Sequence, residues 1–388
     1  MRGEAPIEHG RPRASGGDGS LAPPTDPIAA APNGGAGGSG STEEMPRVVL
    51  TRGRMYASIA FIISTAAFLY FVLPKLLGLR DTWNRVQHGN GWWLALGAVF
   101  EVCSFGGYIL LFRGVFLRGG SRIGWRASYE ITMAGLAATR LFASAGAGGI
   151  ALTAWALRRS GMEPKLVACR MVAFMALLYA VFMGCLVIGG LGLYLGAFPG
   201  AAPFAITIVP AIFGAVVIAI FLAVSLLPDD VDRLVARWSH GGRLGRLAGH
   251  AAAAPAAAAS GIRTAIGLVR SRNASLLGAI AWWGFDIAVL WSCFHAFGGS
   301  PPAAVVVMSY FIGMVGNVLP LPGGIGGVDG AMIGAFSAFG VAPSLAVVSV
   351  LAYRALAFWL PTLPGAVAYL QLRRTVHRWR TERAPSYT

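Results

Sequence analysis

The apolar residues of this chain are gathered in long, nearly uninterrupted blocks, each about as long as a helix that crosses the hydrocarbon core of a bilayer, roughly 20 residues. Charged residues, glycine and proline are concentrated in the connections between the blocks. Apolar and polar positions do not alternate regularly, as they would in a membrane-spanning barrel. The pattern therefore predicts six membrane-spanning helices, at Tyr56–Leu73, Trp92–Phe112, Met171–Ala197, Phe204–Leu227, Leu276–Phe297 and Leu345–Leu370.

Composition supports a membrane protein, and the placement of charge predicts the orientation of the chain in the membrane. Hydrophobic residues make up 56% of the chain and charged residues 12%, too few charges to cover a soluble domain of this size. The net charge of +15 lies mainly in alternate connections, which is the positive-inside pattern, so we expect both termini in the cytoplasm and no nucleic-acid partner. Because arginine almost replaces lysine, as in high-GC bacterial genomes, we expect a multi-pass protein of a bacterial inner membrane. The basic segments are Arg113–Arg126, Arg158–Lys165, Arg233–Arg272 and Arg373–Arg383. The connection that contains Lys75, Arg80 and Arg85 is an exception, because it is basic but is predicted to lie outside.

The chain divides into a transmembrane domain at 47–374 and two cytoplasmic tails. Residues 1–46 are rich in Gly, Pro, Ala and Ser and cannot bury enough apolar surface to offset the entropy of ordering, which predicts a disordered tail. Residues 375–388 form the second tail. The basic cytoplasmic loop at 228–275 is too short to enclose a catalytic domain, and interfacial helices are expected there.

An internal repeat divides the transmembrane domain into two halves. Gly148-Gly149-Ile150 is followed by a short apolar run and by Gly161-Met162-Glu163-Pro164-Lys165-Leu166. Gly323-Gly324-Ile325 is followed in the same way by Gly340-Val341-Ala342-Pro343-Ser344-Leu345. Two matches in the same order and at nearly equal spacing make coincidence the weaker explanation.

The charges of the connections place the two copies on opposite faces of the membrane. The first copy lies between two basic connections and the second between two uncharged ones, so the first should enter from the cytoplasm and the second from outside. Both are then re-entrant hairpins, Ser128–Leu157 and Ala303–Phe339. We predict an all-α polytopic membrane protein with about six spanning helices and two re-entrant helical hairpins in an inverted repeat, an arrangement typical of transporters with a central site.

The segment Pro320–Gly327 cannot be a continuous helix, because it holds two prolines and four of its residues after Pro322 are glycine. Irregular backbone at membrane depth persists only where protein or a watery cavity covers it. Its free amides, with the start of the next helix, suit an anion such as a lipid phosphate. A close-packed glycine turn without chemical function is an equally good interpretation. The candidate binding residues here are Pro322, Gly323, Gly324 and Gly326, with Gly148 and Gly149 in the first copy.

Ionisable residues inside apolar blocks mark pairing or function, because burying a charge in the membrane costs at least a few kcal/mol. Asp329 follows the glycine turn, where it either caps the next helix or receives a cationic head group or a proton. Arg354 can pair with Asp329 or Asp286, or hold a phosphate. Arg140 precedes the glycines of the first hairpin and is the matching candidate in that half. Glu101 and Glu130 are interpreted as buried pair partners.

Catalysis and metal binding find no support in the sequence. No His, Cys and carboxylate set has the spacing of metal ligands, and no serine has the histidine and aspartate company of a hydrolase. We therefore expect no enzyme activity, no metal and no cofactor. The tryptophans, including Trp282 and Trp283, are most simply membrane-belt or packing residues.

At these residues the chain resembles the transmembrane region of lysylphosphatidylglycerol synthase/flippase proteins. The likeness is carried by Asn317-x-x-Pro320-x-Pro322-Gly323-Gly324-Ile325-Gly326-x-x-Asp329, by Tyr353-Arg354 and by Gly148-Gly149 with Leu157-Arg158-Arg159-x-Gly161. That family usually has Glu where this chain has Asp329. The resemblance covers roughly Arg52 to Arg374 and implies a flippase-like fold with a cavity for lipid head groups. Because the chain ends at Thr388, soon after the last predicted span, we expect no synthase domain and no lipid aminoacylation.

The leading hypothesis is a flippase that moves a polar phospho- or glycolipid between leaflets. Arg140 and Arg354 would hold phosphate, and Asp329 and Asp286 would balance charge. The expected partners are membrane lipids, either an anionic or aminoacylated phospholipid or a polyprenyl-linked glycolipid. The alternative is a non-transporting membrane subunit that docks a lipid-modifying glycosyltransferase or acyltransferase. A membrane enzyme acting on polyprenyl-phosphate lipids is the least favoured reading, because no catalytic constellation supports it.

Overall fold

The computed structural model describes residues 88–117, 123–141, 147–226, 258–318 and 324–381. Within these ranges every regular element is a helix, which confirms the prediction of an all-α membrane protein. The first predicted span, Tyr56–Leu73, the tail at 1–46, and most of the basic loop lie outside the described residues. Of the second predicted tail, 375–388, residues 375–381 are described and continue α15, whereas 382–388 lie outside.

Five helices among the described residues are long and apolar enough to cross a membrane, and they match the five later predicted spans. They are α4 (Gly91–Phe116), α7 (Pro164–Tyr194), α8 (Phe204–Ser225), α11 (Leu277–Ala296) with the short η2 (Ala274–Leu276) before it, and the run of α14 (Pro343–Arg354), η5 (Ala355–Trp359) and α15 (Leu360–Thr381). Residues 258–270 form a further helix that precedes η2. Proline begins both α7 and α14, where its missing N–H has no partner to lose.

Two pairs of shorter helices lie between the long ones, at the places of the two predicted hairpins. The first pair is α5 (Trp125–Leu141) with α6 (Ala147–Arg159), and the second is α12 (Ala303–Val315) with α13 (Gly327–Ala338), joined through η3 (Gly316–Val318). The helices of each pair pack on each other. A helix of 12 or 13 residues, such as α6, α12 or α13, is about 20 Å long and falls short of the roughly 30 Å hydrocarbon core.

The repeat seen in the sequence has the same local structure in both copies. Gly161 and Gly340 both have positive φ, 98° and 85°. Each donates its N–H to the carbonyl three residues back, and the residue after each donates to the carbonyl five residues back. This is the Schellman ending of a helix, which favours glycine at that position. Both halves therefore end their short helix and begin the next long one with the same device.

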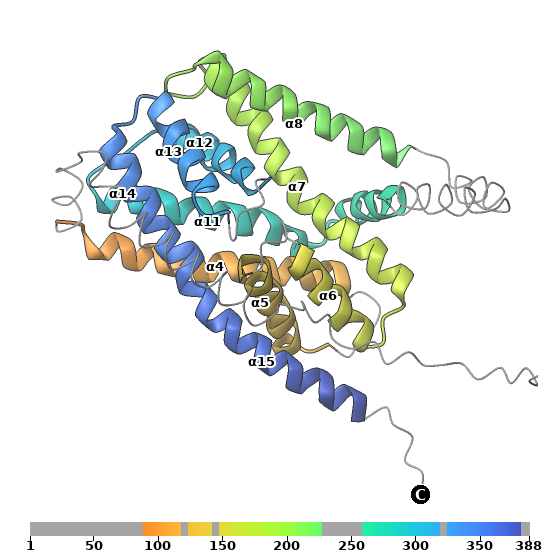
Figure 1. Cartoon of the computed structure of the whole chain (residues 1–388). Coiled ribbons are helices and arrows are strands. Elements are labelled where there is room, and N and C mark those ends of the chain that lie inside the picture. The colour runs from red at the N-terminus through yellow and green to blue at the C-terminus, as the bar shows by residue number, and fades with distance from the viewer. Residues whose placement is uncertain (1–87, 118–122, 142–146, 227–257, 319–323, 382–388) are drawn as a thin grey trace, which may run out of the picture. The chain divides into compact units, whose positions relative to one another are not determined.

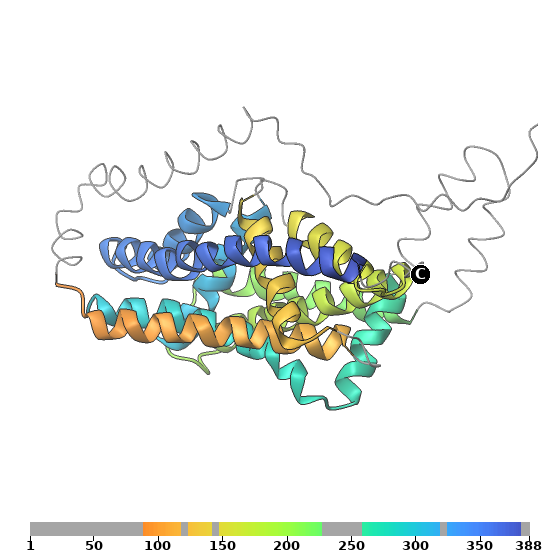
Figure 2. The ribbon, with the colours of Figure 1, turned by 90° about the horizontal axis from the view of Figure 1, so that it is seen from below.

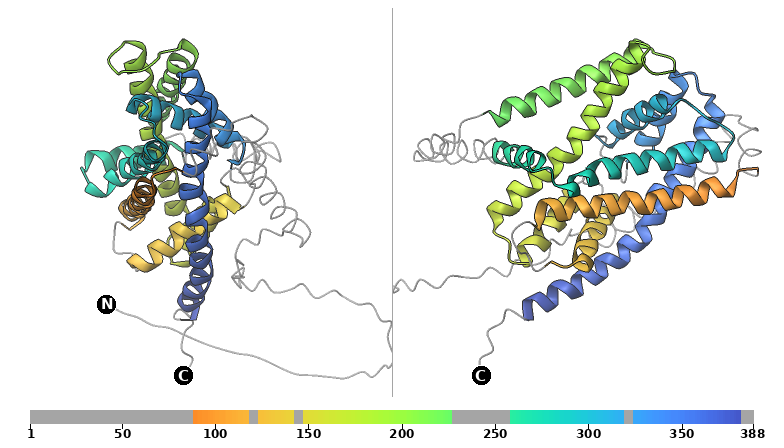
Figure 3. Two further views of the ribbon diagram at one scale, coloured as in Figure 1. Left: turned by 90° about the vertical axis from the view of Figure 1, so that its left-hand side faces the viewer. Right: turned by 180° about the vertical axis from the view of Figure 1, so that it is seen from behind.

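The helix packing is also repeated (Figures 1 and 2). α4 lies antiparallel to α11; α5 packs on α15 in one half, as α12 packs on α7 in the other. Thus α5, in the first hairpin, contacts the long helix α15 that follows the second hairpin. In the same way α12, in the second hairpin, contacts the long helix α7 that follows the first hairpin. α8 packs on α7 at the side of the bundle, away from α4 and α15 (Figure 3). These reciprocal contacts intertwine the two halves of the chain.

Candidate functional site

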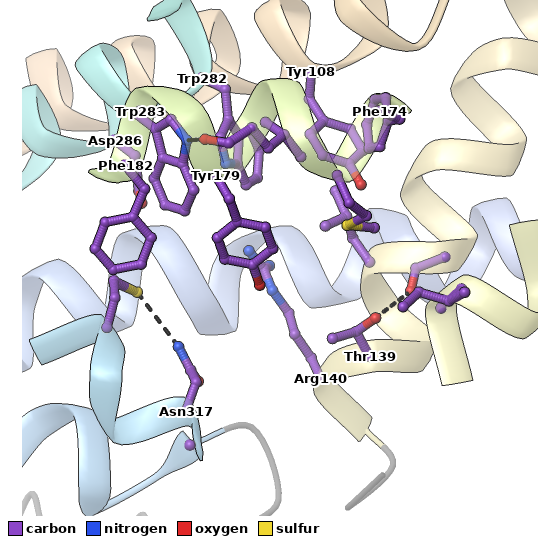
Figure 4. A pocket seen from close by; sticks show the side chains of 18 of the residues that line it. Tyr108, Thr139, Arg140, Phe174, Tyr179, Phe182, Trp282, Trp283, Asp286 and Asn317 are labelled. Atoms are coloured by element: carbon purple, nitrogen blue, oxygen red, sulfur yellow. Dashed lines mark hydrogen bonds between the residues drawn. The ribbon is translucent and has the colours of Figure 1, made fainter. Parts of the chain in front are cut away.

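A cavity of about 710 Å³ is lined by residues of both hairpins. Its lining comes from α4, α5, α6, α7, α8, α11, α12 and the α14–η5 segment, with Asn317 and Gly324 from the turn of the second hairpin. Most of the wall is aromatic or aliphatic (Figure 4). The aromatic residues include Tyr108, Phe174, Tyr179, Phe182, Trp282, Trp283 and Tyr310.

Three charged side chains line this apolar cavity: Arg140, Asp286 and Arg354. Arg140 extends into it from the last turn of α5, and Asp286 faces it from halfway along α11 (Figure 4). An ionic group in such a setting needs partners, because burial removes the water that would solvate it. Each of the three has partners that the structure identifies.

Asp286 is the centre of a buried polar network. One of its carboxyl oxygens, Oδ2, accepts hydrogen bonds from the hydroxyls of Tyr310 and Tyr353, the latter at 3.0 Å. The Glu101 carboxyl on α4 lies within hydrogen-bonding reach of the Asp286 carboxyl, and Arg140 lies close enough to interact with both. The network joins α4, α5, α11, α12 and α14 at one point.

Arg140 is held in place by a backbone group and two rings. Its Nη1 donates to the carbonyl oxygen of Phe358 at 3.3 Å, within the π-helical turn η5. Its guanidinium carbon lies 5.6 Å from the ring centre of Phe105 and 5.5 Å from that of Phe358, within the range of a cation–π interaction. Since Phe358 is contacted from α5, the π-helical turn belongs to the wall of the site; such turns are frequent at functional sites.

Arg354 and Asp329 form a buried ion pair, with Arg354 Nε 2.7 Å from Asp329 Oδ1. The second oxygen of Asp329 accepts the N–H of Gly326 at 2.8 Å, so Asp329 also caps the start of α13. The sequence left open whether Arg354 pairs with Asp329 or with Asp286. In the structure it pairs with Asp329. Asp329 does not line the cavity.

The glycines predicted to bind substrate have unequal positions. Gly149 and Gly324 line the cavity, whereas Gly148 and Gly326 do not, and Pro322 and Gly323 lie outside the described residues. A side chain at Gly149 would collide with Thr139 and with the carbonyl of Gly135. Gly324 has a φ of +64°, and a Cβ there would collide with Asn317. Close packing thus explains both glycines even though both border the cavity.

Sequence reasoning missed several residues of the site. Trp282 and Trp283 line the cavity, and Trp283 donates its indole N–H to the Leu178 carbonyl at 2.9 Å, so they are wall residues rather than belt anchors. The sequence did not indicate a role for Tyr310, because a single tyrosine in an apolar helix is common. Tyr353 was named only as part of a motif, next to Arg354. Among the described residues, no three His, Cys, Asp or Glu side chains lie together as metal ligands would.

The cavity opens sideways between helices. Four of its lining residues are large, apolar and exposed: Ile150 by 44%, Tyr179 by 45%, Val315 by 48% and Phe213 by 52%. They come from α6, α7, α12 and α8. In a membrane protein, exposed apolar side chains of this kind face lipid chains rather than water. The cavity therefore reaches the protein surface at apolar side chains.

The fold and cavity define a multi-pass α-helical membrane protein with a central apolar cavity that holds a few charged groups. The chain belongs to the family of the lysylphosphatidylglycerol synthase TM region, whose model matches residues 56–365.

Several archaeal proteins described as UPF0104 membrane proteins are similar to parts of the chain. One from Methanothermobacter thermautotrophicus is 36% identical over 115 residues, which cover 28% of this chain and 34% of that protein. One from Methanocaldococcus jannaschii is 35% identical over 95 residues (24% and 28%), and one from Pyrococcus horikoshii is 30% identical over 106 residues (27% and 32%). The chain thus matches about a third or less of the length of these relatives.

Proposed function

We propose that this protein is a lipid flippase, which carries a phosphate-bearing lipid between leaflets by enclosing its head group in the central cavity. The observation that carries the proposal is the cavity itself: polar and charged at its centre, apolar along its walls, and open at the side towards lipid chains. A lipid has this same distribution of polarity. The family to which the chain belongs is named for the membrane region of a lipid-synthesising protein, which supports a lipid as the ligand.

The size of the cavity fits the head group of a lipid rather than the whole molecule. A volume of about 710 Å³ lies within the usual range of small-molecule sites, about 300–1,000 Å³. The acyl or prenyl chains would stay in the bilayer and pass through the side opening between Ile150, Tyr179, Phe213 and Val315. Only the charged head group then needs a polar path across the hydrocarbon core.

Arg140 is the residue best placed to hold the phosphate. Arg354 already has a carboxylate at 2.7 Å, whereas Arg140 donates a hydrogen bond to a neutral carbonyl. Guanidinium groups bind phosphate oxygens in pairs, which gives both strength and orientation. Asp286, Tyr310 and Tyr353 surround the same point with groups that can bind the hydroxyls or the amine of a head group.

The inverted repeat that the sequence predicts for the two hairpins would supply the means of alternating access. Related halves of opposite orientation can exchange conformations, so that the site opens first to one face and then to the other. The site lies at the middle of α11 and at the tips of half-length helices, as this mechanism requires.

Leaflet exchange in reconstituted vesicles tests the proposal. Phosphatidylcholine vesicles with a trace of fluorescent phosphatidylglycerol are treated with an impermeant quencher, and the rate at which inner-leaflet label becomes quenchable is compared with that of protein-free vesicles. We expect faster exchange with the wild-type protein. The variant Arg140→Gln should slow exchange at least tenfold, since the loss of one charged hydrogen bond removes about 1.5–3 kcal/mol.

The matched control is Arg113→Gln. Arg113 lies in the last turn of α4, bound to the Ser128 hydroxyl at 2.9 Å and stacked on Trp125, but it does not line the cavity. This variant should exchange lipid at the wild-type rate, once both variants are shown to be monodisperse. Wild-type exchange no faster than in empty vesicles, for phosphatidylglycerol, its lysyl ester and a polyprenyl-phosphate lipid alike, would contradict transport and favour the docking alternative.

A further inference from the structure

The carboxyl groups of Glu101 and Asp286 lie close together at the centre of the molecule, and only Asp286 lines the cavity. Glu101 is 3% exposed and Asp286 is 8% exposed. They come from α4 and α11, the two helices that lie antiparallel at the centre of the two halves, and their carboxyls are within hydrogen-bonding reach. Two carboxylates so close, and so deeply buried, cannot both be ionised without a large repulsion. One proton must be shared between them.

The hydrogen bonds of the pair locate this proton. Asp286 accepts from the hydroxyls of Tyr310 and Tyr353 and lies near Arg140, so it has the donors that an ionised carboxylate needs. Glu101 Oε2 is buried and has no hydrogen-bond partner within the described part of the chain. A buried, ionised oxygen without a donor is far more costly than a neutral one. Glu101 is therefore the protonated member, and its hydroxyl donates to Asp286.

The charged groups around the pair sum to zero in this state. Glu101 is neutral, and Asp286 carries a negative charge that Arg140 from α5 balances. Arg354 from α14, the next nearest cation, is already balanced by Asp329 from α13. The groups that face the pair from α12 and α14 are the neutral hydroxyls of Tyr310 and Tyr353. The empty site is thus electrically neutral, as a site at membrane depth should be.

A bound phosphodiester upsets this balance by one charge. If the head group takes the guanidinium of Arg140, Asp286 loses its counter-ion and the site gains a net negative charge. A second proton, taken by an Asp286 carboxyl oxygen from water on the side from which the lipid enters, restores neutrality. When the lipid leaves on the other side, Arg140 returns to Asp286 and the proton is released to water there. No further co-reactant is needed.

We infer that the Glu101–Asp286 carboxyl pair is a proton-binding site, and that one proton crosses the membrane with each phosphate-bearing lipid. The inference rests on the proposed flippase function and adds its energy source. Asp286 is the group that gains and loses the transported proton. Glu101 keeps its own proton throughout and serves as a neutral donor to Asp286.

An imposed pH gradient tests the coupling. Phosphatidylcholine vesicles contain the protein, a trace of fluorescent phosphatidylglycerol and a potassium ionophore that clamps the membrane potential. With acid outside, the labelled lipid should accumulate in the inner leaflet, by about tenfold for one pH unit if one proton accompanies one lipid, since each unit is worth 1.36 kcal/mol per proton. Asp286→Asn should abolish this bias. Asp286→Glu, which restores a carboxyl, should retain it.

The control for Glu101→Gln is Glu130→Gln. Glu130 is also fully buried, but it lies outside the cavity and is bound to Arg126 and Thr375. In the infrared spectrum of the wild-type protein at neutral pH, the carbonyl stretch of a protonated carboxyl group should be present; it should be absent in Glu101→Gln and present in Glu130→Gln. If that band is absent in the wild type, or survives in Glu101→Gln, the assignment of the proton to Glu101 is wrong.

The failures of the two proposals are distinguishable. Exchange that is fast but reaches the same leaflet distribution with and without the pH gradient, or a bias that persists in Asp286→Asn, overturns the coupling and leaves the flippase intact. Wild-type exchange no faster than in empty vesicles overturns the flippase, and lipid-coupled proton movement with it.

Discussion

At the scale of single residues, burial requires that polar side chains be paired. Arg354 and Asp329 bind each other, Glu130 binds Arg126 and Thr375, and Asp286 binds two tyrosines. An ionic group without such partners would be expelled to the membrane surface or neutralised. The polar residues of the central site therefore also hold the helices together. A change that removes one partner affects stability as well as binding.

The Arg354–Asp329 pair gives a stability prediction. Asp329→Ala leaves a buried guanidinium without its carboxylate and the N-terminus of α13 without its cap, so we expect a loss of about 3–5 kcal/mol. Asp329→Glu, which keeps the carboxylate, should lose far less, because glutamate at the third position of a helix also caps. Thermal unfolding in detergent, followed by tryptophan fluorescence, measures both.

A double-variant cycle is the control for this prediction. If the pair acts as a unit, adding Arg354→Met to Asp329→Ala should recover part of the lost stability, because the unpaired charge is removed. Equal melting temperatures for Asp329→Ala and the wild type would show that the pair contributes nothing.

The candidate residues could be found from the sequence, but most of their contacts could not. Arg140, Asp286 and Arg354 stood out because charge is rare inside apolar blocks. The contact between Glu101 and Asp286 joins helices distant in sequence, and no local pattern encodes which face of α4 meets α11. The roles of Tyr310 and Trp283 were hidden for another reason: an aromatic residue in an apolar helix has the same appearance whether it faces lipid, packing partners or a cavity.

At the scale of helices, five of the six predicted spans match helices of membrane length among the described residues, with errors at their ends. The third span was predicted to begin at Met171, but α7 begins at Pro164, because Lys165 and Arg170 lie within the helix instead of ending it. Long basic side chains can extend from a helix end to a polar surface, so charge marks the edge of the apolar core and not the end of the helix. The π-helical turn η5 in the last span had no detectable signal.

Glycine allows the two central helices to approach closely, and this yields a second prediction. A Cβ added to Gly107 would lie 2.7 Å from Ala281 Cβ and 2.9 Å from the Gly278 carbonyl oxygen, whereas one added to Gly106 would meet nothing within 4 Å. Small residues at helix interfaces in membranes let backbones pack. Gly107→Ala should therefore lower the melting temperature of the protein in detergent.

Gly106→Ala is the matched control, because both changes replace glycine by alanine within one helix. Without a clash, that change favours the helix by up to about 1 kcal/mol, so Gly106→Ala should leave the melting temperature unchanged or raise it. A shift of the same size and sign for the two variants would contradict close packing of α4 on α11.

At the scale of the whole molecule, the sequence predicts two related halves that face opposite directions, from two glycine and proline motifs and from loop charges. The structure adds that Gly161 and Gly340 end their helices with the same hydrogen bonds, and that each hairpin packs on the long helix of the other half. Such reciprocal packing means that neither half is complete alone, so we regard the two hairpins as one functional unit.

The membrane orientation of the two hairpins is the last prediction. If both are re-entrant, the two ends of each hairpin lie on the same face, and the two hairpins lie on opposite faces. On a background with Cys103, Cys169, Cys185 and Cys293 replaced, single cysteines report this at exposed positions flanking each hairpin: Gly124→Cys and Glu163→Cys for the first, Ala303→Cys and Ala342→Cys for the second. An impermeant maleimide added to intact cells should label the second pair and reach the first pair only after permeabilisation, because the basic connections stay inside. Labelling of Ala303→Cys and Ala342→Cys from different faces would mean that α12 and α13 together cross the bilayer. In that case the two halves would not be inverted, and alternating access through a shared central cavity would lose its basis.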